Sequence, residues 1–226
     1  MGARTLCLFL LVFLGLHPIA AGAVIRVPRD HATIQQALQA ASAGDTVLVA
    51  PGIYKELITW PARDGIRLVG ELGPAQTTID AGGAGRVVTM GSGLTRATLL
   101  QGFTITGGLL KTDRNYGCGI NVASSPTIRG NVIKDNLGDG PNWNYGGGIY
   151  VAGGSALIEG NTISGNLLQN GSWNYGAGIY ISSGAQPEVL CNDIRQNGNV
   201  GGSRGYGAGI FVGGSPAPVL ASNLIF

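Results

Sequence analysis

Aromatic and basic residues recur at a fixed spacing in the second half of the chain. The tyrosines lie 29, 30 and 31 residues apart, at Tyr116, Tyr145, Tyr175 and Tyr206. Two positions before each tyrosine lies one member of a second column, Arg114, Trp143, Trp173 and Arg204. Flat aromatic rings pack against the apolar faces of sugar rings, so one interpretation is a sugar-binding platform with these tyrosines and tryptophans as its ligand-binding residues. The alternative is a structural stack, held by cation–π contacts with an arginine at each end.

Acidic residues supply a second candidate site. Glycoside hydrolysis needs two carboxylates about 5 to 9.5 Å apart, and Asp113 and Asp139 lie in corresponding segments of successive repeats. Arg114 or Arg204 would lie near this pair. No known motif links these four candidate catalytic residues, and the other acids of the repeats do not align with one another. Solvated surface carboxylates are therefore the alternative interpretation.

Metal and redox chemistry find little support in the sequence. His31 is the only histidine beyond the first 23 residues. Cys118 and Cys191 occupy different positions of repeats about 10 Å apart, beyond the roughly 7 Å that a disulfide spans, so we expect two separate, half-buried thiols. Gly138-Asp139-Gly140 lacks the glycine-rich calcium-binding repeat. No metal and no cofactor are predicted.

The charge of the chain narrows its possible partners. Its 14 basic and 12 acidic residues are scattered and give a formal net charge of +2. No basic stripe suits nucleic acid, and no polybasic segment suits an anionic lipid surface. A polysaccharide or a cell-surface glycan is the partner that the aromatic columns favour.

The tyrosines belong to a longer repeat that predicts the fold. Each unit of about 30 residues also contains an Asn-x-Ile segment, headed by Asn131, Asn161, Asn192 and Asn223. A fixed period of this size indicates a solenoid or a propeller. The apolar runs are short, rich in Ile and Val and bounded by Gly, Asn and Ser, which is typical of strands. Propeller blades need about 40 to 45 residues, whereas three short strands per coil fit this period, so a parallel β-helix is expected.

Stacked coils place equivalent side chains about 4.8 Å apart along the axis. The isoleucine of the Asn-x-Ile segment would form an inner column, which extends backwards to Ile105 and Ile79 at spacings of 28 and 26 residues. The four asparagines would form a ladder at one bend, with side-chain amides bonded along the axis and backbone angles that asparagine tolerates in the left-handed region. This ladder is interpreted as structural.

The N-terminal part follows a different pattern. Thr33-Ile34-Gln35-Gln36 has the form of a capping box. Ile34, Ala37, Leu38 and Ala41 then form one apolar helical stripe, which Gly44 would end. We expect a short helix that covers the first coil, followed by strands at 46–50, 53–59 and 66–69.

These segments carry a family resemblance. The stretch 33–56, the Gly-Gly-Gly-Ile-Tyr segment and the Asn-x-Ile-x-x-Asn units resemble secreted right-handed β-helix proteins of the pectin-lyase-like superfamily, over residues 24–226. The resemblance implies an all-β, right-handed parallel β-helix solenoid with a short N-terminal capping helix. The superfamily includes pectate lyases, polygalacturonases and pectinesterases, but the catalytic patterns of these enzymes are not recognisable in this chain.

Three functions therefore stay open. The first is a secreted carbohydrate- or surface-binding module without catalysis. The second is a polysaccharide lyase or glycoside hydrolase of the same superfamily. The third is a purely structural surface protein.

The ends of the chain complete the predicted organisation. Residues 1–23 combine Arg4, an apolar run over 6–16 and Ala21-Gly22-Ala23, which is typical of a signal peptide; a retained membrane anchor is the alternative. Residues 24–60 would form the N-terminal cap and 61–226 the coils. We expect a secreted protein with no membrane span after cleavage. Because the chain ends inside a coil, we also expect a fragment of a longer protein or an end-to-end contact with a partner.

Overall fold

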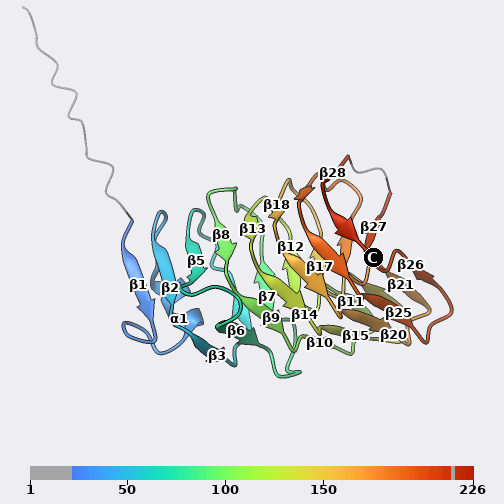
Figure 1. Cartoon of the computed structure of the whole chain (residues 1–226), viewed down its shortest axis with the longest axis horizontal. Helices are drawn as coiled ribbons and strands as arrows, with labels where there is room; N and C mark the ends of the chain where they lie inside the picture. Colours follow the sequence, from blue (N-terminus) through green and yellow to red (C-terminus); the bar gives the residue numbers. More distant parts are fainter. Residues whose placement is uncertain (1–21, 215–216) are drawn as a thin grey trace, which may run out of the picture.

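Successive coils of parallel strands build the molecule along one axis (Figure 1). The computed structural model describes residues 22–214 and 217–226, which form a right-handed parallel β-helix with one short helix. The predicted fold class is thereby confirmed. The predicted signal peptide lies outside the described residues except for its last two positions. Within the described residues, no helix has the length and apolar character needed to cross a membrane.

Three sheets, named A, B and C here, enclose the core. Sheet A contains β1 (Val24–Val27), β2 (Thr46–Val49), β5 (Arg67–Gly70), β8 (Leu99–Gln101), β13 (Thr127–Arg129), β18 (Leu157–Glu159), β23 (Glu188–Leu190) and β28 (Val219–Ala221). Sheet B contains β3 (Gly52–Tyr54), β6 (Thr77–Asp80), β9 (Thr104–Thr106), β14 (Val132–Lys134), β19 (Thr162–Ser164), β24 (Asp193–Arg195) and β29 (Leu224–Ile225). Sheet C contains β4 (Ile58–Thr59), β7 (Val88–Met90), β12 (Ile120–Val122), β17 (Ile149–Val151), β22 (Ile179–Ile181) and β27 (Ile210–Val212).

The strand predicted at 53–59 divides between two sheets. Its first part belongs to β3 in sheet B and its last part to β4 in sheet C. The chain must bend between them because a coil closes around a narrow interior. The strands predicted at 46–50 and 66–69 correspond to β2 and β5.

The predicted isoleucine column fills the interior beside sheet B. Ile79, Ile105, Ile133, Ile163 and Ile194 are paired in register from coil to coil. All five side chains are fully buried. Full burial of an isoleucine stabilises the folded state by about 1.5 to 3 kcal/mol relative to an exposed side chain. The column therefore sets the register of the coils as well as filling the core.

The bends of the coil correct one expectation about asparagine. The left-handed residues are those just before the ladder asparagines, Gly130, Gly160, Cys191 and Ser222, with φ between 54° and 61°. The asparagines themselves lie outside the left-handed region, because the preceding residue makes the turn and so directs the asparagine side chain inward. The predicted ladder itself is confirmed.

Each ladder asparagine bonds to the next coil through its own backbone and side chain. Asn131 N and Nδ2 both donate to Asn161 Oδ1, at 3.0 and 3.1 Å. Asn161 repeats this pattern with Asn192 Oδ1, at 2.9 and 3.0 Å. A second ladder of the same kind joins Asn136, Asn166 and Asn197. The buried amides are thus satisfied along the axis, as burial of polar groups requires.

The helix α1 (Ile34–Ala40) packs against β1, β2 and β4 at the start of the coil. Thr33 is its N-cap and accepts from Gln36 N at 3.2 Å, as the capping box predicts. The remaining N-terminal amides of the helix donate to Glu56, from Ile34 N and Gln35 N, at 2.9 Å each. This tertiary cap was not predicted, because Glu56 lies more than 20 residues further along the chain.

The helix ends earlier than predicted. Its last residue is Ala40, and Ala41 is already extended, with φ −66° and ψ 146°. Gly44, with φ +89°, lies in the turn that follows. The Asp45 carboxylate accepts from Ser42 N at 2.8 Å and so stabilises that turn in place of a longer helix.

Candidate functional site

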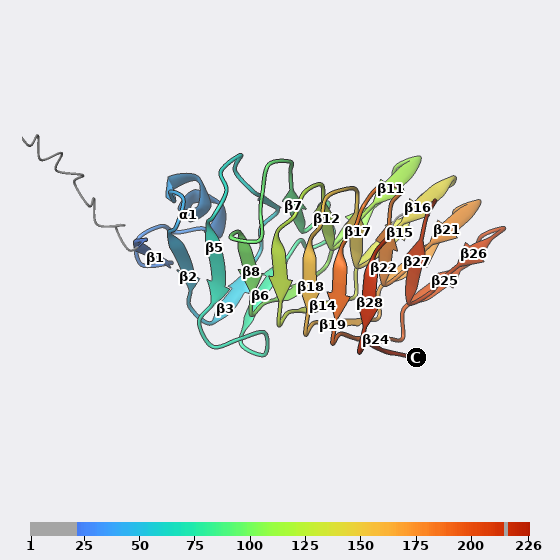
Figure 2. The same cartoon turned by 90° about the horizontal axis from the view of Figure 1, so that it is seen from above.

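The segments that carry the aromatic columns form two further sheets. Sheet D contains β10 (Leu109–Leu110), β15 (Leu137–Asp139), β20 (Leu167–Gln169) and β25 (Gly198–Val200). Sheet E contains β11 (Arg114–Tyr116), β16 (Trp143–Tyr145), β21 (Trp173–Tyr175) and β26 (Gly205–Tyr206). These coils therefore have five strands rather than the predicted three. Figure 2 shows the segments projecting side by side from the C-terminal half of the coil, and we call them the arm.

A third asparagine ladder lies inside the arm. Asn115 Nδ2 donates to Asn144 Oδ1 at 2.7 Å, and Asn144 Nδ2 donates to Asn174 Oδ1 at 2.8 Å. All three side chains are buried. The asparagines alternate with the outward-facing residues of sheet E, so the ladder holds the tryptophan and tyrosine side chains on the outer surface.

The tyrosine column of the arm is formed as predicted. Tyr116, Tyr145, Tyr175 and Tyr206 are paired in register through sheet E. Successive ring centroids are 5.3, 5.3 and 5.1 Å apart, and adjacent ring planes differ by at most 11°. The rings form one continuous offset stack along the axis.

The neighbouring column of tryptophans and arginines is also formed. Arg114, Trp143 and Trp173 are paired in register. The Arg114 guanidinium lies 4.2 Å from the centroid of Trp143, and that of Arg204 lies 4.1 Å from the centroid of Trp173. The predicted cation–π contacts are confirmed at both ends, and each contributes about 0.5 to 2 kcal/mol.

A third aromatic column, which the sequence analysis did not identify, belongs to sheet C. Tyr150, Tyr180 and Phe211 are paired in register, with centroids 5.4 and 5.7 Å apart. They meet the tyrosines of the arm at a steep angle: Tyr145 and Tyr180 lie 4.8 Å apart with planes at 65°. The signal was the aromatic residue that follows the isoleucine in the last three of the four Gly-x-Gly-Ile segments; the first segment has Asn121 at that position.

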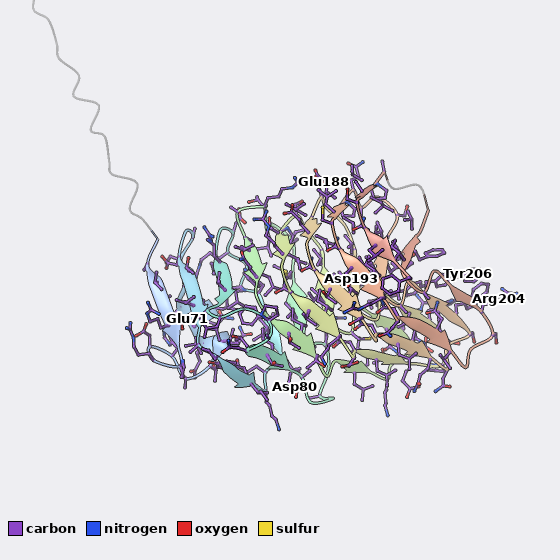
Figure 3. The ribbon with its side chains drawn as sticks, in the orientation of Figure 1. Glu71, Asp80, Glu188, Asp193, Arg204 and Tyr206 are labelled. Atoms are coloured by element: carbon purple, nitrogen blue, oxygen red, sulfur yellow. The ribbon has the colours of Figure 1, made fainter. Side chains whose placement is uncertain are left out.

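Together the three columns form a surface that we call the aromatic face. Its members are Tyr116, Trp143, Tyr145, Tyr150, Trp173, Tyr175, Tyr180, Tyr206 and Phe211. They lie on two sheets that are joined by the tight turn between the tyrosine of sheet E and the isoleucine of sheet C. In Figure 3, the labelled Arg204 and Tyr206 mark the end of this face on the outermost coil of the arm.

The orientation of the rings corrects the expected flat platform. An inner ring such as Tyr145 is stacked on both sides, so neighbouring rings share its faces. A guanidinium covers one face of each tryptophan. In the described part of the chain, the hydroxyls of the aromatic face make no hydrogen bond to protein groups, and none is a buried atom without a partner. The surface therefore presents ring edges, with hydroxyls that are not bonded to protein groups, repeated from coil to coil.

Crowding of the rings changes their acid–base behaviour. Burial, followed by the neighbouring Tyr180, Tyr116, Tyr175 and Tyr150, raises the pKa of Tyr145 to about 12. Burial likewise raises the pKa of Tyr175 and Tyr180. Tyr145, Tyr175 and Tyr180 are therefore neutral across the physiological range and can act through hydrogen bonds and apolar contact.

This shift predicts a late tyrosine titration. In the folded protein, phenolate absorbance should show a component near pH 12 that Tyr145→Phe removes and that full denaturation moves to about pH 10. As the pH rises, the Tyr145 hydroxyl loses its proton at a lower pH in the unfolded chain than in the folded protein. The contribution of Tyr145 to the free energy of unfolding should therefore be complete below pH 10 and fall as the pH rises towards 12. A folded protein whose tyrosines all titrate together near pH 10 would contradict the packing described here.

The predicted acid pair has other partners in the structure. Asp139 Oδ1 accepts from Asn170 Nδ2 at 2.7 Å, and Lys111 Nζ lies 3.9 Å from Asp139 Oδ2. Asp113 accepts from Asn142 Nδ2. Each carboxylate therefore binds an asparagine of the next coil, which is the arrangement of a structural surface acid. Arg114 and Arg204, the proposed cationic members of that site, lie on the tryptophan rings.

The cysteines differ from the expectation of two half-buried thiols. Both are free, but Cys118 is buried and Cys191 is exposed. Burial raises the pKa of Cys118 to about 12, so its thiol is neutral and unreactive under ordinary conditions. In residues 22–214 and 217–226, no group of three or more His, Cys, Asp or Glu side chains is placed to hold a metal ion.

Arg86 supports the first coil of the arm by hydrogen bonds to its backbone. Its guanidinium donates to Tyr116 O at 2.6 Å and to Gly117 O at 2.9 Å. Arg86 precedes β7, one coil below these carbonyls, and so satisfies backbone groups at the open side of the first aromatic turn. Nothing in the repeat identifies this residue, since it falls on the coil before the repeat begins.

Comparison with known proteins agrees with this geometry. A family model described as right handed beta helix region matches residues 141–226. The matched segment contains the last coils of the arm, with both tryptophans. No curated protein and no solved structure matched the chain.

Proposed function

We propose that this chain, a right-handed parallel β-helix repeat protein, is a carbohydrate-binding module. In this proposal, its aromatic face binds an extended polysaccharide or surface glycan. The β-helix fold supports membership of the pectin-lyase-like superfamily, many of whose members act on such polymers. The proposal does not include catalysis.

One observation carries this proposal: hydroxyl-bearing aromatic side chains repeat at about 5 Å along the axis on two adjoining sheets. A polymer with a repeating, hydroxyl-rich unit can form equivalent contacts with successive coils. Tyrosine and tryptophan provide large contact areas at a low cost in side-chain entropy. The stacked rings are already ordered before binding, which lowers this cost further.

The two alternatives differ in what they require of these residues. A lyase or hydrolase would need reactive carboxylates, but Asp113 and Asp139 are engaged by asparagine and lysine side chains. A purely structural role would need only the stack itself, and the stack does stabilise the arm. The hydroxyls favour binding over structure alone, because they are not bonded to protein groups and stacking makes no use of them.

A pull-down on insoluble polysaccharides tests the proposal. Tyr145→Phe/Tyr175→Phe keeps the stacked rings and removes two hydroxyls, so retention should weaken by roughly tenfold, since a hydrogen bond contributes about 0.5 to 1.5 kcal/mol. Trp143→Ala/Trp173→Ala should weaken it further. Each variant is compared with the wild type by the amount of protein retained at increasing polysaccharide concentration.

The matched control removes apolar area elsewhere. Ile53 and Leu72 are 71% and 57% exposed on the N-terminal coils, and Ile53→Ala/Leu72→Ala should leave retention unchanged. Equal retention of the wild type and of both aromatic variants would overturn the proposal. Reducing-end and unsaturated-product assays on the same polysaccharides test the enzyme alternative, which turnover lost in Asp139→Asn would favour.

A further inference from the structure

An open pocket lies on the outer side of sheet A, on β5, β8 and β13. Its volume is about 260 Å³, and Arg67, Arg96, Leu99, Thr127 and Arg129 are among the residues that line it. Arg67, Leu99 and Thr127 are paired in register on three successive coils. Arg129 follows two residues after Thr127 and so lies on the same face of the sheet. Three arginines thus line one pocket.

Arg96 reaches the pocket from the loop before β8. Its backbone oxygen accepts from Thr127 Oγ1 at 3.0 Å, which ties the loop to β13, the third coil of the pocket. Its guanidinium lies 2.6 Å from Glu188 Oε1, on the far side of the cavity from β5. The side chain is therefore held along the axis, across the outer face of the sheet.

The arginines of the pocket differ in their acidic partners. Arg96 is paired with Glu188, and Arg129 with Glu159 at 2.8 Å. Both acids come from later coils, whereas Arg67 lies at the opposite end of the pocket and has no acidic partner within 4.0 Å among the described residues. Among the three lining arginines, Arg67 is therefore the one without a carboxylate partner in the described residues; one further carboxylate, Asp64, lies beside the loop of Arg96 and accepts from Thr95 N at 2.8 Å.

The ion pairs of Glu159 and Glu188 with arginine also indicate which chemical groups the pocket can bind. Glu159 and Glu188 are carboxylates that already occupy one side of two guanidinium groups. Arginine presents five N–H donors in a planar fork that suits carboxylate, sulfate and phosphate oxygens. A volume of about 260 Å³ corresponds to roughly eight or nine water molecules in the liquid, enough for an oxyanion with a small group attached.

We propose that this pocket is a binding site for an oxyanion, a phosphate, sulfate or carboxylate group, held by Arg67 and Arg129 above the apolar floor of Leu99. The site is separate from the aromatic face and does not depend on it. In Figure 3, Glu188, the partner of Arg96, lies on a different side of the molecule from Arg204 and Tyr206. The ligand can be a free anion or the charged group of a polymer.

Calorimetric titration of the full chain with sodium phosphate and sodium sulfate, at constant ionic strength, tests the site. We expect saturable binding that Arg67→Gln weakens about tenfold, because a charge-assisted hydrogen bond is lost. Glu159→Gln should tighten binding severalfold, since it frees the guanidinium of Arg129. A loss of structure alone would not produce this gain.

Arg195→Gln is the control, because Arg195 likewise lies on a strand surface, on sheet B and away from the pocket, where it pairs with Asp193 at 2.9 Å. A sulfated dextran oligomer and neutral dextran distinguish the two sources of the oxyanion. Binding of phosphate and sulfate indicates a free anion, and binding of the sulfated oligomer alone indicates a polymer. Either result supports the site if Arg67→Gln weakens that binding about tenfold. No saturable binding of any probe, or equal weakening by Arg195→Gln, would overturn the proposal.

Discussion

Replacement of Gly176 by alanine should lower the free energy of unfolding by about 3 kcal/mol or more. Gly176 has φ +61° and lies between β21 and β22, in the turn that joins the arm to sheet C. An added Cβ would overlap the carbonyl oxygen of Ile179 and lie 2.8 Å from its carbonyl carbon and 3.0 Å from Tyr180 Cα. These are backbone atoms, so the turn itself would have to move. Urea denaturation of the wild type and the variant measures the difference.

Gly160→Ala separates this overlap from the backbone angle. Gly160 has the same φ, +61°, but no atom lies within 4 Å of an added Cβ. The equivalent positions of later coils already hold Cys191 and Ser222 at φ 54° and 55°. We expect a cost of about 1 kcal/mol, the ordinary penalty for a side chain in the left-handed region. Equal costs at the two glycines would show that crowding in the aromatic turn is not the cause.

Removal of one inner asparagine should destabilise the fold by about 3 to 5 kcal/mol. Asn161→Ala would leave four groups without their partner: Asn131 N, Asn131 Nδ2, the Ile128 oxygen and Asn192 Oδ1. Asn161 is 1% exposed, so water cannot replace these bonds. Each buried group left unpaired costs about 1 to 3 kcal/mol, and some retain a second bond. Chemical denaturation followed by circular dichroism gives the size of the loss.

Asn223→Ala is the control at the other end of the same ladder. Asn223 accepts from Asn192 N and Nδ2, both at 3.0 Å, and donates to Val189 O at 2.8 Å. The apolar residues around it, Leu224 and Ile225, are 59% and 52% exposed, so water reaches this coil. A loss of about 1 kcal/mol is expected. An equally small loss of stability in Asn161→Ala would contradict the prediction, because it would mean that the hydrogen bonds of the inner amides contribute little to the free energy of unfolding.

The repeat contained most of the architecture. Ile133, Ile163 and Ile194 are neighbours in space because each coil pairs with the next in the same register. The same rule placed Arg114 against Trp143 and aligned the tyrosines of the arm. In a solenoid, a difference of one period in sequence becomes one step of about 4.8 Å in space. Sequence spacing and spatial distance are then almost the same quantity.

Features that depend on one coil alone were not predictable in this way. Glu56 caps α1 from a later coil that is not part of the repeat. Arg67, Arg96 and Arg129 occupy three different positions of their coils, so no alignment of repeats brings them together. Long charged side chains can also reach several coils, as Arg96 does to Glu188. Such contacts follow from the course of one loop rather than from a period.

The sequence by itself therefore determined the β-helix, its isoleucine column, the ladder of Asn131 and the two aromatic columns of the arm, because identical residues one period apart must stack. Only the tertiary structure decided that the arm consists of paired strands, that Tyr150 and Tyr180 join its tyrosines, and that the rings turn their edges to solvent. Those properties depend on the angle between two sheets and on side-chain rotamers. The repeat period of the sequence specifies neither this angle nor these rotamers.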